Sequence, residues 1–133
     1  MLSLRFPRLW LSLGWIAVAA ATLACLVPTE QLPQPPDISD KTEHFLAYLV
    51  LSVWFAGIYR RSRYWIIAIG LIAMGILIEL AQEAMGLGRQ GDMLDVIANC
   101  SGVLTGLLLC WFGLGGWMQW VEALVSKAQA ENS

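Results

Sequence analysis

Polar side chains with the chemistry to bind a ligand or move a proton recur within otherwise apolar stretches of this sequence. They are Lys41, His44, Tyr48, Glu79, Gln82, Arg89, Asp92, Asp95 and Asn99. Most follow one another at steps of three or four residues, which places neighbours on one face of a helix. Lysine and arginine can hold a phosphate or carboxylate, and histidine beside a carboxylate can act as an acid or a base. We therefore predict a ligand-binding site formed by these residues, with His44, Glu79 and Asp95 as the candidate catalytic groups.

The composition around these residues is that of an integral membrane protein. Of 133 residues, 58% are hydrophobic and only 14% are charged, and the mean hydropathy is +0.63. A soluble domain usually carries about a quarter charged residues. The formal charge of −2 gives no reason to expect nucleic acid as a partner, and the three cysteines lack the spacing of a disulfide framework or a zinc motif. The sequence therefore predicts no cofactor and no metal.

The apolar residues fall into four stretches of about the length that crosses a bilayer as a helix, roughly 20 residues. These predicted spans cover residues 9–27, 42–59, 64–85 and 93–112. Beyond them, residues 117–128 carry Trp117, Trp120 and further apolar side chains at helical spacing, which favours an amphipathic helix at the membrane interface. We predict an all-α protein with a four-helix transmembrane domain at 1–112 and a C-terminal interfacial helix and tail at 113–133.

Lysine and arginine are shared unequally between the two sides of this arrangement. One side holds Arg5, Arg8, Arg60, Arg61, Arg63 and Lys127, and the other holds Lys41 and Arg89. Positive residues stay in the cytoplasm, so we expect both termini there and the loops at 28–40 and 86–92 outside. A signal peptide that is cleaved before Cys25 is less favoured, because the apolar stretch continues beyond this residue.

This topology brings the polar residues to one depth in the membrane. Asp40 can cap the second helix and Glu43 can complete a capping box, so that helix starts near the outer surface. Glu79 lies about 22 Å along a helix that enters from the cytoplasm at Tyr64. On the fourth helix one stripe carries Asp92, Asp95, Asn99, Gly102 and Gly106. Its two glycines have the spacing of a close helix contact. We expect the second, third and fourth helices to share a polar outer end, to which the first contributes nothing.

In their order and separation, these residues resemble the VanZ-like family of small bacterial membrane proteins. The matching segments are Asp40-Lys41-x-x-His44-Phe45-x-x-Tyr48, Glu79-x-x-Gln82 and Gly88-Arg89-x-x-Asp92-x-x-Asp95-x-x-Ala98-Asn99-x-x-Gly102-x-x-x-Gly106. The family is named for an accessory protein linked to resistance to the glycopeptide teicoplanin. The resemblance implies a multi-pass protein of the bacterial inner (cytoplasmic) membrane that acts in the cell envelope, with an effect on glycopeptide susceptibility as one role.

We expect the site to receive a membrane lipid or a lipid-linked envelope precursor from the outer leaflet, with the headgroup in the polar mouth and the tail between helices. One alternative is an intramembrane enzyme, in which His44 works with Glu79 or Asp95 as acid–base groups. A metal-assisted version with Asp92 as a further ligand is weak, because no HExxH motif is present. The other alternative is a purely structural polar cluster. A proton or ion pathway is least favoured, because the inner halves of these helices carry few polar groups.

Overall fold

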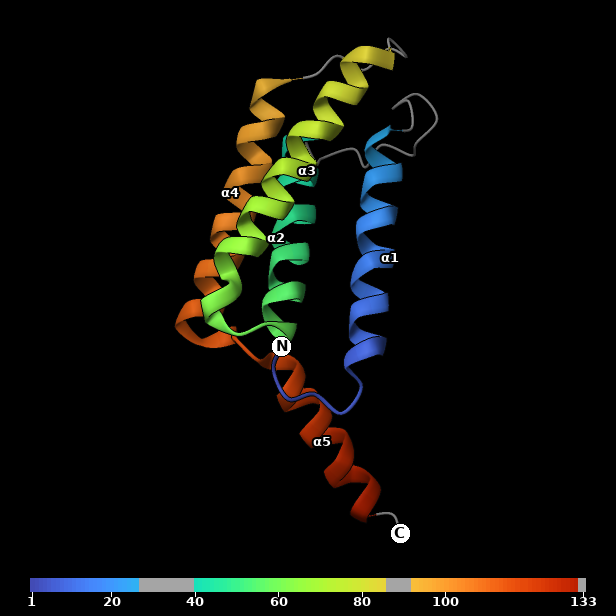
Figure 1. Ribbon diagram of the computed structural model, residues 1–133, viewed down its shortest axis with the longest axis vertical. Coiled ribbons are helices and arrows are strands. Elements are labelled where there is room, and N and C mark those ends of the chain that lie inside the picture. The colour runs from blue at the N-terminus through green and yellow to red at the C-terminus, as the bar shows by residue number, and fades with distance from the viewer. Residues whose placement is uncertain (27–39, 86–91, 132–133) are drawn as a thin grey trace.

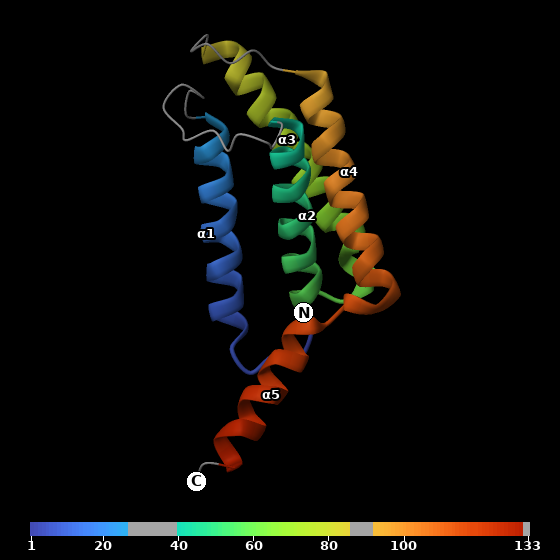
Figure 2. The same cartoon turned by 180° about the vertical axis from the view of Figure 1, so that it is seen from behind.

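The computed structural model describes residues 1–26, 40–85 and 92–131, and this part of the chain is helical apart from short turns, without strands. The helices are α1 (Pro7–Leu26), α2 (Asp40–Ile58), α3 (Tyr64–Met85), α4 (Met93–Leu109) and α5 (Trp117–Glu131). A 3-10 turn, η2 (Arg61–Arg63), precedes α3, and a π turn, η3 (Cys110–Leu114), follows α4. Helices α1 to α4 stand side by side and α5 projects from one end of them (Figures 1 and 2). The predicted all-α class is confirmed.

Three of the described helical segments are long and apolar enough to cross a membrane. They are Pro7–Leu26, Arg61–Met85 and Met93–Leu114. Helix α2 has a similar length of 19 residues but is not among them, because its first turn carries Asp40, Lys41 and Glu43. The sequence-based count of four apolar spans is thus too high by this criterion. The chain is a membrane protein by composition, with three candidate spans.

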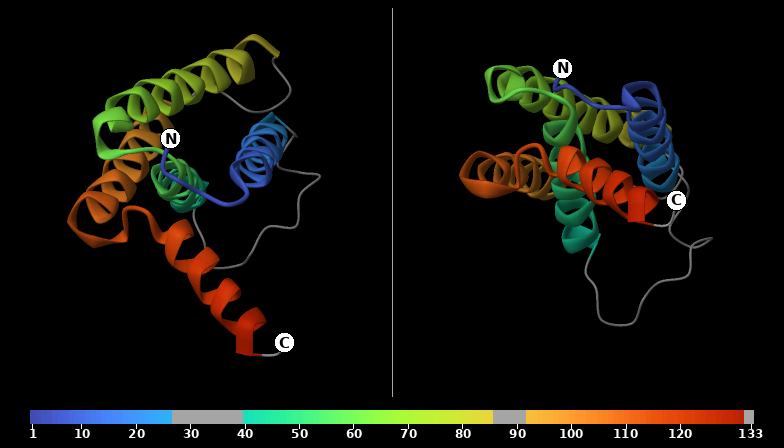
Figure 3. Two further views of the ribbon diagram at one scale, coloured as in Figure 1. Left: turned by 60° about the horizontal axis from the view of Figure 1, so that its bottom comes forward. Right: turned by 90° about the horizontal axis from the view of Figure 1, so that it is seen from below.

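Helix α2 lies at the centre of the bundle, with α1, α3 and α4 around it (Figure 3, left). Its closest neighbour is α4, and two glycines make this approach possible. A Cβ atom on Gly102 would collide with the carbonyl oxygen of Phe45, and a Cβ on Gly106 would lie 2.8 Å from the carbonyl oxygen of Leu49. The predicted close contact of the fourth helix therefore exists, and its partner is α2.

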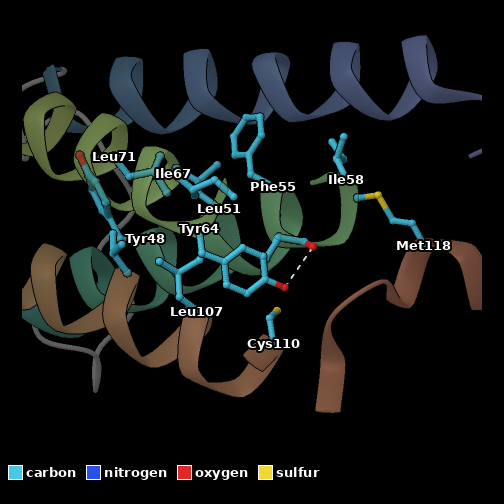
Figure 4. Packing of buried hydrophobic residues seen from close by; sticks show 12 residues of the cluster. Tyr48, Leu51, Phe55, Ile58, Tyr64, Ile67, Leu71, Leu107, Cys110 and Met118 are labelled. Atoms are coloured by element: carbon cyan, nitrogen blue, oxygen red, sulfur yellow. Dashed lines mark hydrogen bonds between the residues drawn. The ribbon is translucent and has the colours of Figure 1, made fainter. Parts of the chain in front are cut away.

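The apolar core surrounds α2, between this helix and α1, α3 and α4, and continues to α5 at one end of the bundle (Figure 4). Leu51, Phe55 and Leu71 are buried there, and Met118 of α5 is fully buried at the lower end of this core beside Ile58. Many large apolar side chains on the outer faces of α1, α3 and α4 are exposed, among them Trp15, Ile69, Leu77, Leu104 and Leu108. Such extensive exposed apolar surface is typical of a face that meets lipid.

The two ends of the bundle differ in chemistry. We call the end formed by the start of α2, the end of α3 and the start of α4 the polar end, and the opposite end, where α5 lies, the base. At the base, the indoles of Trp10, Trp54 and Trp117 contact one another edge to face, with ring centroids 5.6–5.8 Å apart. Trp117 packs directly on Gly57, where a Cβ would lie within 2.9 Å of its ring carbon Cδ1. These contacts join α1, α2 and α5.

Glu122 of α5 binds the start of α1 and fixes the two helices to each other. Its carboxylate accepts hydrogen bonds from the backbone N–H of Arg5 (2.6 Å) and of Phe6 (3.0 Å), and from the indole N–H of Trp10 (2.9 Å). Desolvation acts to raise the pKa of Glu122, but these hydrogen bonds outweigh it, and the pKa is lowered. The predicted C-terminal amphipathic helix is present as α5, but its role in capping α1 was not predicted from the sequence.

Candidate functional site

Five polar side chains are buried together at the polar end. Their exposed fractions are His44 4%, Glu79 5%, Gln82 3%, Asp95 5% and Asn99 1%. They come from α2, α3 and α4, so the structure brings together the buried members of the set that the sequence singled out. Tyr48, one turn along α2 from His44, is also buried. Arg89 lies outside the described residues.

The imidazole of His44 is held between polar groups of all three helices. Its Nδ1 lies 3.1 Å from the amide oxygen of Asn99 and 3.9 Å from Oε1 of Glu79. Because an amide oxygen only accepts hydrogen bonds, this contact places the proton of a neutral imidazole on Nδ1 and leaves the lone pair on Nε2. Nε2 faces the carboxylate of Asp40 at 4.0 Å. The ring can therefore accept a proton, or bind an ion, on the side of Asp40.

Three buried polar atoms next to this histidine make no hydrogen bond within the described part of the chain. They are the hydroxyl of Tyr48, Oδ1 of Asp95 and Nδ2 of Asn99. The absence of a side chain at Gly75 makes room beside two of them, since a Cβ there would lie 3.0 Å from Asn99 Nδ2 and 3.2 Å from the Tyr48 hydroxyl. An unpaired buried polar group costs about 1–3 kcal/mol. This cluster is therefore poorly explained as a device for packing stability alone.

Lys41 lies at the rim of the polar end and is engaged by two aspartates. Its Nζ lies 2.9 Å from Oδ2 of Asp92 and 3.5 Å from Oδ1 of Asp95. Asp92 also caps α4, because its Oδ1 accepts a hydrogen bond from the backbone N–H of Leu94 at 2.8 Å. That bond, together with the ammonium of Lys41, lowers the pKa of Asp92. Glu79 also contacts the start of α4, since its Oε2 accepts a hydrogen bond from the backbone N–H of Asp92 at 3.1 Å.

The charge at the polar end differs from the sequence-based expectation. We expected Lys41 and Arg89 to form a cationic mouth for a phosphate or carboxylate. Among the described residues, the cluster at the polar end includes four carboxylates but one ammonium group. The ammonium of Lys41 lies near Asp92 and Asp95, and the carboxylates of Asp40 and Glu79 lie near His44. The ammonium of Lys41 thus neutralises protein carboxylates and does not stand free for an anion. This part of the site favours a cation or an uncharged hydrogen-bonding group.

Helix α1 contributes to the polar end through its backbone, contrary to the expectation that it contributes nothing. The side-chain amide of Gln82 donates a hydrogen bond to the carbonyl oxygen of Cys25 at 2.7 Å. Carbonyl groups in the last turn of a helix have no partner within the helix, so Gln82 satisfies one of them. No side chain of α1 carries this contact, and for that reason the sequence contained no signal for it.

An apolar crevice of about 600 Å³ runs between α1, α2 and α3 from the base toward the polar end. Trp15 and Thr22 line it on α1, Phe55 and Tyr59 on α2, and Met74 on α3. Met74 lies five residues before Glu79, which is about 7–8 Å along the helix axis. Apart from Thr22, Tyr59 and Arg63, the lining residues are apolar, as are the side chains exposed on the outer faces, so sequence patterns could not distinguish this crevice from the outer surface.

Three of the polar-end residues could hold a metal ion together. One ligand atom each of Asp40, His44 and Asp95 lies within 4.8 Å of the others. No metal was expected from the sequence, and the weaker metal-assisted alternative had Glu79 and Asp92 as ligands in place of Asp40. In the structure Asp92 caps α4, and Glu79 faces the protonated nitrogen of His44.

No family model, no curated protein and no solved structure matches this chain. The resemblance to the VanZ-like family therefore stays a prediction based on the quoted residues. What the molecule does has to be argued from its geometry.

Proposed function

We propose that this protein binds the polar group of a membrane amphiphile at its polar end, while the apolar chain of the amphiphile lies in the crevice between α1, α2 and α3. The observation that carries the proposal is the set of buried polar atoms without a hydrogen bond on Tyr48, Asp95 and Asn99, in the same bundle as an apolar crevice whose lining residue Met74 lies five residues before Glu79. A ligand with both hydrogen-bonding groups and a long chain fits both features at once.

The proposal includes a topology with four spans, in which α2 is the fourth. Although its first turn is polar, α2 is surrounded by α1, α3 and α4, so its charged residues meet protein groups and water at the rim instead of lipid. The excess of lysine and arginine at the base puts both termini in the cytoplasm. The polar end then faces outward, and a bacterial inner (cytoplasmic) membrane is the setting that the VanZ-like motifs favour.

The chemistry of the unpaired atoms indicates which headgroups would be recognised. The carboxylate of Asp95 accepts hydrogen bonds, whereas the amide N–H of Asn99 and the hydroxyl of Tyr48 donate them. Headgroups that carry both hydroxyl or amide N–H donors and carbonyl or phosphate acceptors satisfy all three. Lipid-linked envelope precursors and glycosylated lipids have this composition, and interference with such a precursor would change glycopeptide susceptibility.

Native mass spectrometry of the purified protein tests this proposal through the lipids that it retains from a bacterial membrane extract. Asn99→Leu removes a polar group, and Gly70→Phe fills the crevice at a position where a Cβ meets nothing within 4 Å. Glu43→Gln is the control, because Glu43 is exposed on the same helix as His44. We expect at least tenfold less bound amphiphile in the first two variants and wild-type retention in the third. Unchanged retention in both Asn99→Leu and Gly70→Phe would refute the proposal.

An acid–base enzyme is the second candidate, and the position of His44 favours it. Its ring lies within about 4 Å of the carboxylates of both Glu79 and Asp40, an arrangement that suits proton transfer. The hydroxyl groups of Ser52 and Ser101 bond to carbonyl groups of their own helices, so a serine nucleophile is not indicated. Incubation of the bound amphiphile with wild type and with His44→Gln distinguishes the two candidates. Chemical conversion by wild type alone would favour the enzyme.

A further inference from the structure

The start of α2 and the start of α4 place one imidazole and two carboxylates around a common point. Ligand atoms of Asp40, His44 and Asp95 all lie within 4.8 Å of one another. Some point therefore lies within about 2.8 Å of all three atoms, compared with about 2.0–2.2 Å for zinc–nitrogen and zinc–oxygen bonds. Side-chain movements of less than about 1 Å close this difference. The side chain of Asp40 is 42% exposed, so it is not enclosed by the core.

The histidine is oriented as a metal ligand requires. A ligating imidazole usually donates its other N–H to an oxygen of the protein, which fixes the tautomer and the ring plane. Here the amide oxygen of Asn99 takes this role at 3.1 Å from Nδ1. Nε2 is therefore the coordinating atom, and it is the atom that faces Asp40. Asn99 itself is 1% exposed and cannot turn toward water.

Asp95 provides a second and independent indication of a cation. Its side chain is only 8% exposed, and its Oδ1 makes no hydrogen bond within the described part of the chain. A buried carboxylate needs a positive partner. The ammonium of Lys41 stands 3.5 Å away, longer than a hydrogen bond, and is held more closely by Asp92 at 2.9 Å. A metal ion could replace the ammonium of Lys41 as the partner of Asp95, while Lys41 stays paired with Asp92.

We infer that Asp40, His44 and Asp95 bind one divalent transition-metal ion. One nitrogen and two carboxylate oxygens suit Zn²⁺ or Mn²⁺ better than Ca²⁺, which takes oxygen ligands, or Cu(I), which takes sulfur. Three protein ligands leave a coordination position open, and a phosphate or carboxylate oxygen of a ligand could fill it. The metal site shares residues with the proposed amphiphile site but does not require an amphiphile.

Metal titration of the full chain in detergent, after removal of metals with a chelator, tests the inference. Zn²⁺ bound per chain is measured by elemental analysis, and Mn²⁺ binding is measured by electron paramagnetic resonance. We expect one ion per chain for wild type and for Glu43→Gln, a control that removes an exposed carboxylate from the same helical turn. Affinity should fall at least tenfold in Asp40→Asn, His44→Gln and Asp95→Asn.

Lys41→Gln adds a variant whose metal affinity is expected to rise, whereas that of the other three variants is expected to fall. Without the competing ammonium, Asp95 should bind the ion several-fold more tightly, a result that misfolding cannot produce. Asp40→Asn changes only a rim residue, so it reports on the site even if the buried variants fail to fold. The absence of stoichiometric metal in wild type, or wild-type affinity in Asp40→Asn, would overturn the inference. Amphiphile retention measured with chelator present tests the proposed function separately.

Discussion

Gly102 sets the distance between α2 and α4, so Gly102→Ala should disrupt the polar end without altering a polar residue. A Cβ at this position would overlap the carbonyl oxygen of Phe45 and lie 3.0 Å from the backbone nitrogen of Leu49. Both are main-chain atoms, which cannot rotate away as a side chain can. Carbon–oxygen contacts in proteins are about 3.3 Å or longer. The two helices must therefore separate by about 1 Å.

Three contributions determine how much Gly102→Ala lowers the free energy of unfolding. Overpacking of this kind costs about 1–3 kcal/mol, and alanine recovers about 1 kcal/mol through its higher helix propensity. The separation also lengthens the hydrogen bond between His44 and Asn99 from 3.1 Å to about 4 Å, because His44 adjoins Phe45 and Asn99 lies one turn from Gly102. Loss of that bond removes a further ~1 kcal/mol. We expect a net loss of about 1–3 kcal/mol in the free energy of unfolding.

Two measurements test this prediction. Reversible unfolding in mixed detergent micelles gives the stability, with Gly70→Ala as the matched control, because a Cβ on Gly70 meets nothing within 4 Å. Nitrogen NMR of the imidazole reports on the hydrogen bond of His44, and its signals are unambiguous because the chain has a single histidine. Gly70→Ala should be neutral or slightly stabilising. If Gly102→Ala were as stable as Gly70→Ala and its histidine signals were unchanged, the proposed role of this glycine would be refuted.

Three further substitutions test contacts at both ends of the bundle. Glu122→Gln weakens the cap on α1. Amide hydrogen exchange in the first turn of α1 should become about fivefold faster, which corresponds to about 1 kcal/mol in the free energy of local opening. Because the pKa of Glu122 is lowered in the folded protein, the full stabilisation by this cap is present above the ordinary carboxyl pKa of 4.5 and is lost as the pH falls through the lowered pKa of the folded state. Gln82→Leu removes the bond to Cys25 and should widen the distance distribution between spin labels on α1 and α3. Trp117→Ala leaves a cavity beside Gly57 and should cost about 2–3 kcal/mol in detergent unfolding, less than for a fully buried tryptophan.

Each of these predictions has a result that would contradict it. Equal protection of the first turn of α1 against amide exchange in wild type and Glu122→Gln would mean that Glu122 does not hold the helix. Identical label distances in wild type and Gln82→Leu would show that the contact with Cys25 does not position α1. Wild-type stability of Trp117→Ala would show that the three indoles at the base do not join the helices.

The positions of the helices could largely be predicted because charged and glycine-rich segments separate the apolar stretches. The predicted range 64–85 is that of α3, and the predicted start at residue 93 is that of α4. The end of α4 was placed at 112, whereas the regular helix ends at Leu109 and passes into η3. The face of α4 was predictable as well, because Asp95, Asn99 and Gly102 recur at helical spacing and are all buried.

The partners of individual side chains could not be predicted, because they depend on distances between helices. Lys41 meets Asp92 across 51 positions in the sequence, and nothing in the two local patterns distinguishes a paired lysine from a free one. Asp40 looked like a helix cap alone, yet its carboxylate lies near both His44 and Asp95. The predicted capping box was reason enough for an aspartate at position 40, so Asp40 was not predicted as a site residue.

The cap on α1 bears on how the protein is made. The backbone of Arg5 meets Glu122 across 117 positions, so translation delivers α1 long before the carboxylate that anchors it. Among its residues only Gly14 is buried, and besides this cap α1 is held by the indole of Trp54 at the base and by Gln82 at its other end. During synthesis α2, α3 and α4 can therefore assemble with a partly anchored α1. Any chain released before position 122 would lack the carboxylate that anchors the start of its first helix.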